Sequence, residues 1–156
     1  MFEFLLFLNS QEEKIVALVQ KANYKFEENT PLCLIGEEFF GFIKKPQKKI
    51  VICTDNAKKY GGYMFAKGPK TEGSFKTGLM IRRAIRHESV HIAQECNGGN
   101  PINQIHEGKA IKMSPYKIEA LEGSAKLTGQ REKEYEAYAL EDRPRKVISL
   151  LKAFCF

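Results

Sequence analysis

The stretch GLMIRRAIRHESVHIAQEC, residues 78–96, decides the fold. Its apolar residues recur at helical spacing, which predicts one amphipathic helix of roughly five turns. The next residues, NGGNP at 97–101, supply glycines that tolerate positive φ and then a proline, so we expect the helix to end there. The apolar stripe consists of Leu79, Ile81, Ala84, Ile85, Val90, Ile92 and Ala93.

The middle of this helix contains an HExxH motif, His87-Glu88-Ser89-Val90-His91. Two histidines four residues apart project from the same helix face, so both imidazoles can reach one zinc ion at about 2.0–2.1 Å. Glu88 lies beside that ion, where a carboxylate can take a proton from the zinc-bound water and deliver one to the leaving group. The motif therefore predicts a zinc-dependent hydrolase with His87 and His91 as ligands and Glu88 as the catalytic base.

A catalytic zinc site needs a third protein ligand and an open position for water. Residues 131–142 read REKEYEAYALED, and two of their glutamates fit the pattern Glu-x-x-Ala. On a helix that continues from Leu127, Glu134 falls on the apolar face, and a buried carboxylate there needs a partner such as zinc. Glu136 falls nearly opposite. We expect Glu134 as the third ligand, with Glu136 and then His106 as alternatives.

The HESVH helix followed by a Glu-x-x-Ala helix resembles the gluzincin zinc metallopeptidases. The string at 86–96 is also similar to small uncharacterised HExxH proteins of cyanobacteria and their phages. Over residues 77–155, the resemblance implies a zincin-like fold, Zn²⁺ as the cofactor, and a peptide or protein as the substrate. It also implies an upstream strand that lines the cleft, and Lys49–Thr54 fits that description. The gluzincin aspartate four residues after the glutamate is absent, because that position is Tyr138.

Gluzincins often stabilise the oxyanion with a tyrosine or a histidine, so the resemblance also implies such a residue in this chain. The spacing of the sequence does not single one out. The candidates are Tyr116, Tyr60, Tyr63 and His106.

The remaining pattern predicts an α+β fold, with a small mixed or antiparallel sheet packed on a helical core that includes the HExxH helix. The 156 residues suit a single domain, 1–156. Ser10 is expected to cap the first helix, and residues 55–62 to form a loop or a short helical turn. Strands are expected at 32–35, 39–43 and 49–54, and helices at 11–23 and 125–141. A last helix is expected from Pro144 onward, with an apolar stripe of Val147, Leu150, Leu151 and Phe154. Loops with short helical pieces are expected at 101–123, a stretch that Pro115 breaks.

The net charge of +6 includes a lysine cluster at residues 44–59 and an arginine cluster at residues 82–86. We expect these clusters to form a solvated basic face. An alternative function is a non-catalytic, zinc-stabilised binding module whose basic surface binds an acidic protein or nucleic acid. A further alternative is a protease that acts on DNA-bound proteins, although no nucleic-acid-binding motif supports it.

The four cysteines show no Cys-x-x-Cys spacing, so we expect free buried thiols, with a bridge between Cys96 and Cys155 left possible. The apolar stretch Phe2–Leu8 is too short to cross a membrane and lacks the flanks of a signal peptide. We therefore expect a soluble, cytoplasmic protein that does not interact with membranes.

Overall fold

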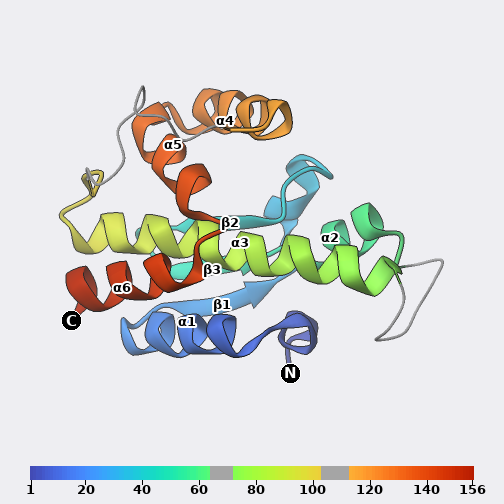
Figure 1. The fold of residues 1–156 in the computed structure, drawn as a ribbon, viewed down its shortest axis with the longest axis horizontal. Helices are drawn as coiled ribbons and strands as arrows, with labels where there is room; N and C mark the ends of the chain where they lie inside the picture. The colour runs from blue at the N-terminus through green and yellow to red at the C-terminus, as the bar shows by residue number, and fades with distance from the viewer. Residues whose placement is uncertain (64–71, 103–112) are drawn as a thin grey trace.

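A long central helix, α3 (Glu72–Cys96), organises the molecule, and most other elements pack against it (Figure 1). The computed structural model describes residues 1–63, 72–102 and 113–156. The HExxH helix predicted from the sequence is confirmed, although it begins at Glu72 and not at residue 78. The other helices are η1 (Glu3–Phe7), α1 (Ser10–Lys21), η2 (Pro31–Ile35), α2 (Thr54–Gly61), α4 (Pro115–Thr128), α5 (Arg131–Leu140) and α6 (Pro144–Cys155).

A small mixed sheet packs against α3 and confirms the predicted α+β class. Its strands are β1 (Lys25–Glu28), β2 (Gly41–Lys44) and β3 (Lys49–Ile52). The order is β1-β3-β2, with β1 parallel and β2 antiparallel to the central strand β3. Strand β3 is β-branched and apolar, which suits its buried central place. Because the order is β1-β3-β2, strand β2 forms one edge of the sheet.

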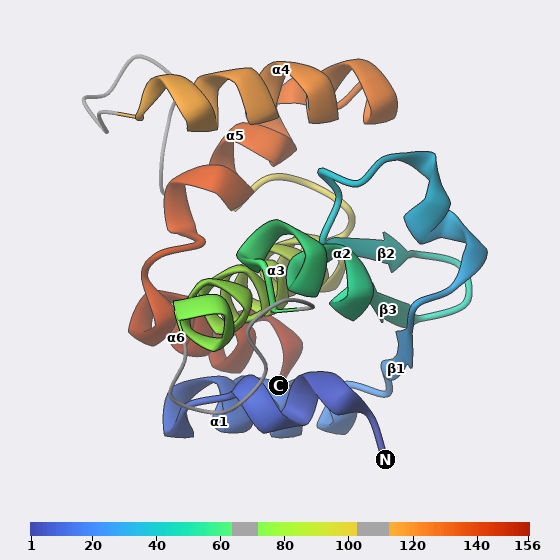
Figure 2. The ribbon, with the colours of Figure 1, turned by 90° about the vertical axis from the view of Figure 1, so that its right-hand side faces the viewer.

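The helices lie on two sides of α3 (Figures 1 and 2). Helices α1 and α6 pack against each other and against α3 on one side, where α6 carries the predicted apolar stripe. Helix α5 packs on α3 from the other side, and α4 packs on α5. Over the described residues, no helix is long and apolar enough to cross a membrane.

The apolar run 32–35 forms the 3₁₀ helix η2 and no strand, so that prediction is wrong. Pro31 occupies the first turn of η2, and its fixed φ favours a helical start. Two of the four side chains face solvent, since Leu34 is 87% exposed and Ile35 is 54% exposed, whereas Cys33 is buried. An apolar run alone does not distinguish these outcomes.

Two helix boundaries after residue 100 also differ from the prediction. Pro115 does not break a helix but begins α4, because proline suits the first helical position and the Ser114 side chain accepts a hydrogen bond of 3.2 Å from the Lys117 amide. Gly129, with a φ of 69°, ends α4. The helix predicted at 125–141 is therefore two helices, α4 and α5.

Two smaller boundary predictions near the N-terminus need correction as well. The residue that precedes α1 is Asn9, which makes no side-chain capping bond, so Ser10 is the first helical residue and not the cap. The segment expected as a loop or short turn at 55–62 forms the helix α2.

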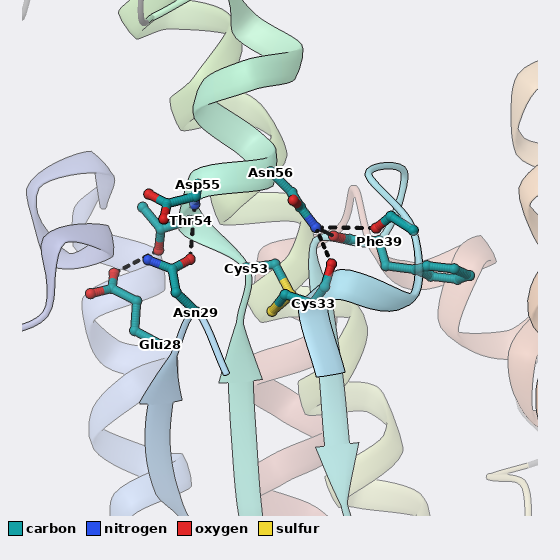
Figure 3. The surroundings of a disulfide bond; sticks show 9 residues. Glu28, Asn29, Cys33, Phe39, Cys53, Thr54, Asp55 and Asn56 are labelled. Carbon is teal, nitrogen blue, oxygen red and sulfur yellow. Dashed lines mark hydrogen bonds between the residues drawn. A yellow bond between two sulfur atoms is a disulfide. The ribbon is translucent and has the colours of Figure 1, made fainter. Parts of the chain in front are cut away.

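All four cysteines are paired, so the expectation of free thiols is wrong. The bridge left possible from the sequence, Cys96–Cys155, joins the end of α3 to the end of α6. The second bridge, Cys33–Cys53, joins η2 to the residue before α2 (Figure 3). Near it, the Asn56 side-chain amide contacts the carbonyl oxygens of Cys33, Gly36 and Phe39 at 2.8–3.2 Å. These contacts fix the loop that leads into β2.

We predict that both disulfides stabilise the fold and that the bridge closing the longer loop does so slightly more. Replacing Cys96 and Cys155 together by serine should lower the free energy of unfolding by about 4 kcal/mol, and replacing Cys33 and Cys53 by about 3 kcal/mol, since longer loops lose more entropy on closure. Urea titration of the oxidised proteins measures this. Unfolded, unreduced protein should not react with a thiol reagent, and four reactive thiols there would contradict the pairing.

Candidate metal centre

Helices α3 and α5 bring three candidate ligand atoms together. His91 Nε2 lies 2.7 Å from Glu134 Oε1, and His87 Nε2 lies 3.6 Å from the same oxygen. One ligand atom from each residue lies within 4.8 Å of the other two. Atoms that bind a tetrahedral ion at about 2.1 Å lie roughly 3.4 Å apart, so one zinc ion fits this spacing. Two nitrogens and one carboxylate oxygen form the ligand set of many catalytic zinc sites.

The other candidate ligands are not part of this group. The Glu136 carboxylate is buried, but one of its oxygens accepts hydrogen bonds from Gln94 Nε2 at 2.9 Å and from the Ile102 amide at 2.8 Å. His106 lies outside the described residues. Of the candidates whose position is described, only Glu134 lies with the two histidines.

The second nitrogen of each histidine also has a partner, which is typical of metal-binding histidines. Gln94 Oε1 lies 2.8 Å from His91 Nδ1, and Glu141 Oε2 lies 3.5 Å from His87 Nδ1. Glu141 follows Glu134 by seven residues, at the end of α5. Its other oxygen lies 3.3 Å from Lys117 Nζ of α4, which holds the carboxylate in position. These partners direct both Nε2 atoms toward Glu134.

The buried charges of the site shift one another's pKa values. Burial alone lowers the pKa of His87, but hydrogen bonds with Glu134 and Glu141 outweigh it and raise this pKa well above its usual value. The pKa of His91 is raised in the same way, against burial, by Glu134. Burial raises the pKa of Glu134, but the charge of His91 and the bonds to both histidines hold it far below its usual value. The metal-free site is therefore a network of ion pairs.

Glu88 follows His87 on α3 and is buried beside the histidines. Burial raises the pKa of its carboxyl group, although the charges of both histidines oppose this. A raised pKa suits a general base that works near neutral pH. A Cβ atom at Gly41 would lie 3.1 Å from Glu88 Cγ, so glycine at this position lets β2 approach α3 closely.

A cavity of about 170 Å³ opens above the three candidate ligands. Strand β2 and the loop before it line this cavity, whereas no residue of the expected strand Lys49–Thr54 does, so that expectation is wrong. The reason is the strand order, which places β3 in the centre of the sheet. The lining also includes Arg83 and Ala84 of α3, Tyr116, Ala120, Ser124 and Leu127 of α4, and Tyr138 of α5.

Of the tyrosines considered from the sequence, only Tyr116 lines the cavity. Tyr60 packs against Phe40, and Tyr63 packs against Phe7. The sequence pattern did not predict a role for Tyr138 at the site. Its ring lies edge-on to the His87 ring, with the two centroids 4.4 Å apart. Its hydroxyl group is 2.7 Å from Ser124 Oγ. Tyr138 therefore supports His87, a candidate ligand, through packing.

The comparisons with known proteins identify a family but no function. The family described as a domain of unknown function, DUF8637, matches residues 4–156. No curated protein and no solved structure matches the chain. The function therefore has to be inferred from the site.

We predict that zinc binding to the metal-free protein releases protons. Because the pKa values of His87 and His91 are raised, these imidazoles hold protons to a higher pH than usual and must lose them to bind metal. Calorimetry in buffers of different ionisation enthalpy should show proton release at pH 7 and less proton release at pH 9. Zinc affinity should therefore fall as pH falls, and zinc binding without proton release at pH 7 would contradict the assignment.

The same shifts fix the sign of the pH dependence of stability. A raised histidine pKa stabilises the metal-free fold fully below pH 6.5, and this contribution is lost as the pH rises through the folded-state value. The free energy of unfolding of metal-free protein should therefore fall from pH 6.5 to pH 9.

We also predict a ranked loss of zinc affinity among the glutamates of this region. Glu134→Ala should abolish stoichiometric binding, because it removes a ligand. Glu141→Gln should weaken binding roughly 10- to 100-fold, as is typical when the partner of a ligand histidine is changed. The matched control is Glu132→Gln, at an exposed position on the same helix, which should bind zinc normally. Competition with a chromophoric chelator measures the affinities, and equal binding by Glu134→Ala and the control would exclude Glu134 as a ligand.

Proposed function

Since the chain belongs to the DUF8637 family, we propose its function from the site alone: a zinc-dependent hydrolase that cleaves peptide bonds, related in design to the gluzincins. One observation carries this proposal. The Nε2 atoms of His87 and His91 and Oε1 of Glu134 converge beside Glu88 at the floor of a cavity. Structural zinc sites have four protein ligands, whereas three ligands beside a cavity leave a position for water.

When bound, zinc would supply a water molecule with a pKa of about 7 and would polarise a substrate carbonyl group. The protein's own contribution is proton transfer by Glu88. Its carboxylate can accept a proton from the attacking water and return one to the leaving amine nitrogen. The close approach of β2 at Gly41 restricts the Glu88 side chain, which favours one orientation of the base.

The edge strand β2 supports a peptide as the substrate. The Cys53 amide donates a hydrogen bond of 2.8 Å to the Phe40 carbonyl oxygen. Phe40 precedes β2 and Cys53 follows β3, so these two residues extend the β2–β3 ladder as a hydrogen-bonded pair. In an antiparallel ladder the alternate residues, Gly41 and Ile43, direct their backbone groups to the outer edge. An extended peptide can add there as a further strand, with its backbone beside the cavity.

Tyr116 is the best-placed residue to stabilise the oxyanion. It lies in the first turn of α4 and lines the cavity opposite α3. Burial raises the pKa of its hydroxyl group, so the group remains a hydrogen-bond donor at neutral pH. Donation to the developing negative charge on the substrate oxygen would lower the barrier to hydrolysis.

The alternative of a zinc-stabilised binding module with a basic surface receives less support. Most side chains of the two basic clusters contact carboxylates of the chain itself, which reduces their attraction for an acidic protein or nucleic acid. Removal of zinc would unfold such a module but would leave most of a catalytic domain folded. The pairs are Lys44 and Lys49 with Glu27, Lys58 with Glu3, Lys59 with Glu37, Arg83 with Asp142, and Arg86 with Glu12.

The disulfides bear on where the enzyme works. Disulfides persist in oxidising compartments and are rare in the cytosol, where thiols are kept reduced. Two bridges that involve all four cysteines favour an oxidising compartment over the cytoplasmic location expected from the sequence.

We predict that Glu88→Gln keeps zinc and loses hydrolysis. The amide is nearly isosteric but cannot accept the proton, so kcat for a fluorogenic peptide should fall by a factor on the order of 10²–10⁴. Glu13→Gln, at an exposed position on α1, is the matched control and should keep full activity. Elemental analysis should show equal zinc in both variants. Undiminished turnover by zinc-loaded Glu88→Gln would refute the proposed chemistry.

A further inference from the structure

A second cavity, of about 110 Å³, adjoins the candidate metal centre. It shares His91 and Glu134 with the metal site, and Ile43 with the edge strand. Its remaining lining is polar, whereas the first cavity also has phenylalanine and tyrosine side chains in its lining. The polar lining residues of the second cavity are Lys45, Thr128, Gln130 and Lys133.

Two half-buried lysines from different elements meet at this cavity. Lys45 follows β2 directly, and its Nζ donates a hydrogen bond of 3.2 Å to Gln130 Oε1. Lys133 lies in the first turn of α5, next to Glu134 in sequence. Both lysine side chains line this one cavity of about 110 Å³, so their ammonium groups can approach the same ligand.

These two lysines differ from the neighbouring basic residues. Lys44 and Lys49 both form ion pairs with Glu27. In the part of the chain that the structure describes, neither Lys45 nor Lys133 has a carboxylate within 4.0 Å. Glu134 also lines this cavity, but it lies with the two histidines of the candidate metal centre, so the two lysines remain available for a carboxylate of a ligand.

We propose that this cavity is a subsite for a carboxylate group of the substrate, bound between Lys45 and Lys133. The inference rests on the proposed peptidase function and names a feature of its substrates. A peptide that pairs with β2 passes Ile43 and then reaches Lys45. Since an extended chain advances about 3.3 Å per residue, the carboxylate belongs to a residue within roughly two positions of the scissile bond.

The carboxylate can come from an aspartate or glutamate side chain or from the C-terminus of the peptide. A zinc-loaded Glu88→Gln protein allows binding to be measured without cleavage. Three kinds of labelled peptide, otherwise identical in sequence, distinguish the two sources of the carboxylate. The first is neutral and amidated, the second is a series of amidated peptides with one glutamate at successive positions, and the third is neutral with a free C-terminus. Fluorescence anisotropy gives Kd for each.

We expect at least one peptide that carries a carboxylate to bind roughly tenfold more tightly than the neutral amidated peptide, because the contact with lysine is charge-assisted. Lys45→Gln and Lys133→Gln should each remove most of this preference and leave the Kd of the neutral peptide unchanged. The matched control is Lys14→Gln on α1, which lines neither cavity and should keep the preference. Equal affinity for all three kinds of peptide would overturn the subsite and leave the peptidase proposal standing.

Glutarate, a small dicarboxylate, tests the subsite independently of the proposed peptidase function. Glutarate should shift the NMR signals of the ¹⁵N-labelled ammonium groups of Lys45 and Lys133. In the Lys133→Gln variant, the shift of the Lys45 signal should disappear. If glutarate binds there but no peptide binds or is cleaved, the carboxylate site stands and the peptidase function falls. If neither glutarate nor any peptide binds, the subsite is overturned.

Discussion

The burial of charged side chains on α3 is the constraint on which the rest of the structure depends. Arg86, His87, Glu88 and His91 all lie in the interior, where an unpaired charge is strongly destabilising. Helix α1 and the α5 region therefore supply the partners. Helix α1 contributes Glu12, whose carboxylate lies 3.0 Å from Arg86 Nη1, and the α5 region contributes the glutamates beside the histidines. The packing around α3 is thus set by charge pairing as well as by apolar contacts.

The pairing of buried charges links the core to the candidate metal centre through Glu141, at the end of α5. The Arg86 guanidinium donates to the backbone carbonyl of Glu141, while the side chain of Glu141 contacts His87. The same residue therefore fixes the end of α5 and orients a candidate ligand. Helix α4 adds Lys117 to the group. Four helices meet at this point, so a change in how any of them packs alters the direction of the His87 ring.

The sequence predicts the parts of the fold and of the site that depend on local spacing. The HExxH helix and the proximity of its histidines follow from helical periodicity, and Glu134 was chosen for its apolar neighbours. That choice assumed a continuous helix through Gly129, where the chain instead turns, so the structure supports the residue but not the assumption. Glu141 was missed because its contact with His87 depends on the angle between two helices. Pro115 was misread because proline both ends and begins helices, and only the capping bond of Ser114 distinguishes the two.

The bridge between Cys33 and Cys53, together with Asn56, has a consequence for affinity. These contacts hold the loop immediately before β2, and that strand is the surface on which an extended chain would be ordered. A mobile edge would lose conformational entropy each time a ligand bound, and the measured affinity would be lower by that amount. Here the loss occurs once, when the protein folds and oxidises. Under the proposed function, preorganisation of this kind would let the edge strand hold a short segment of chain at a smaller entropic cost.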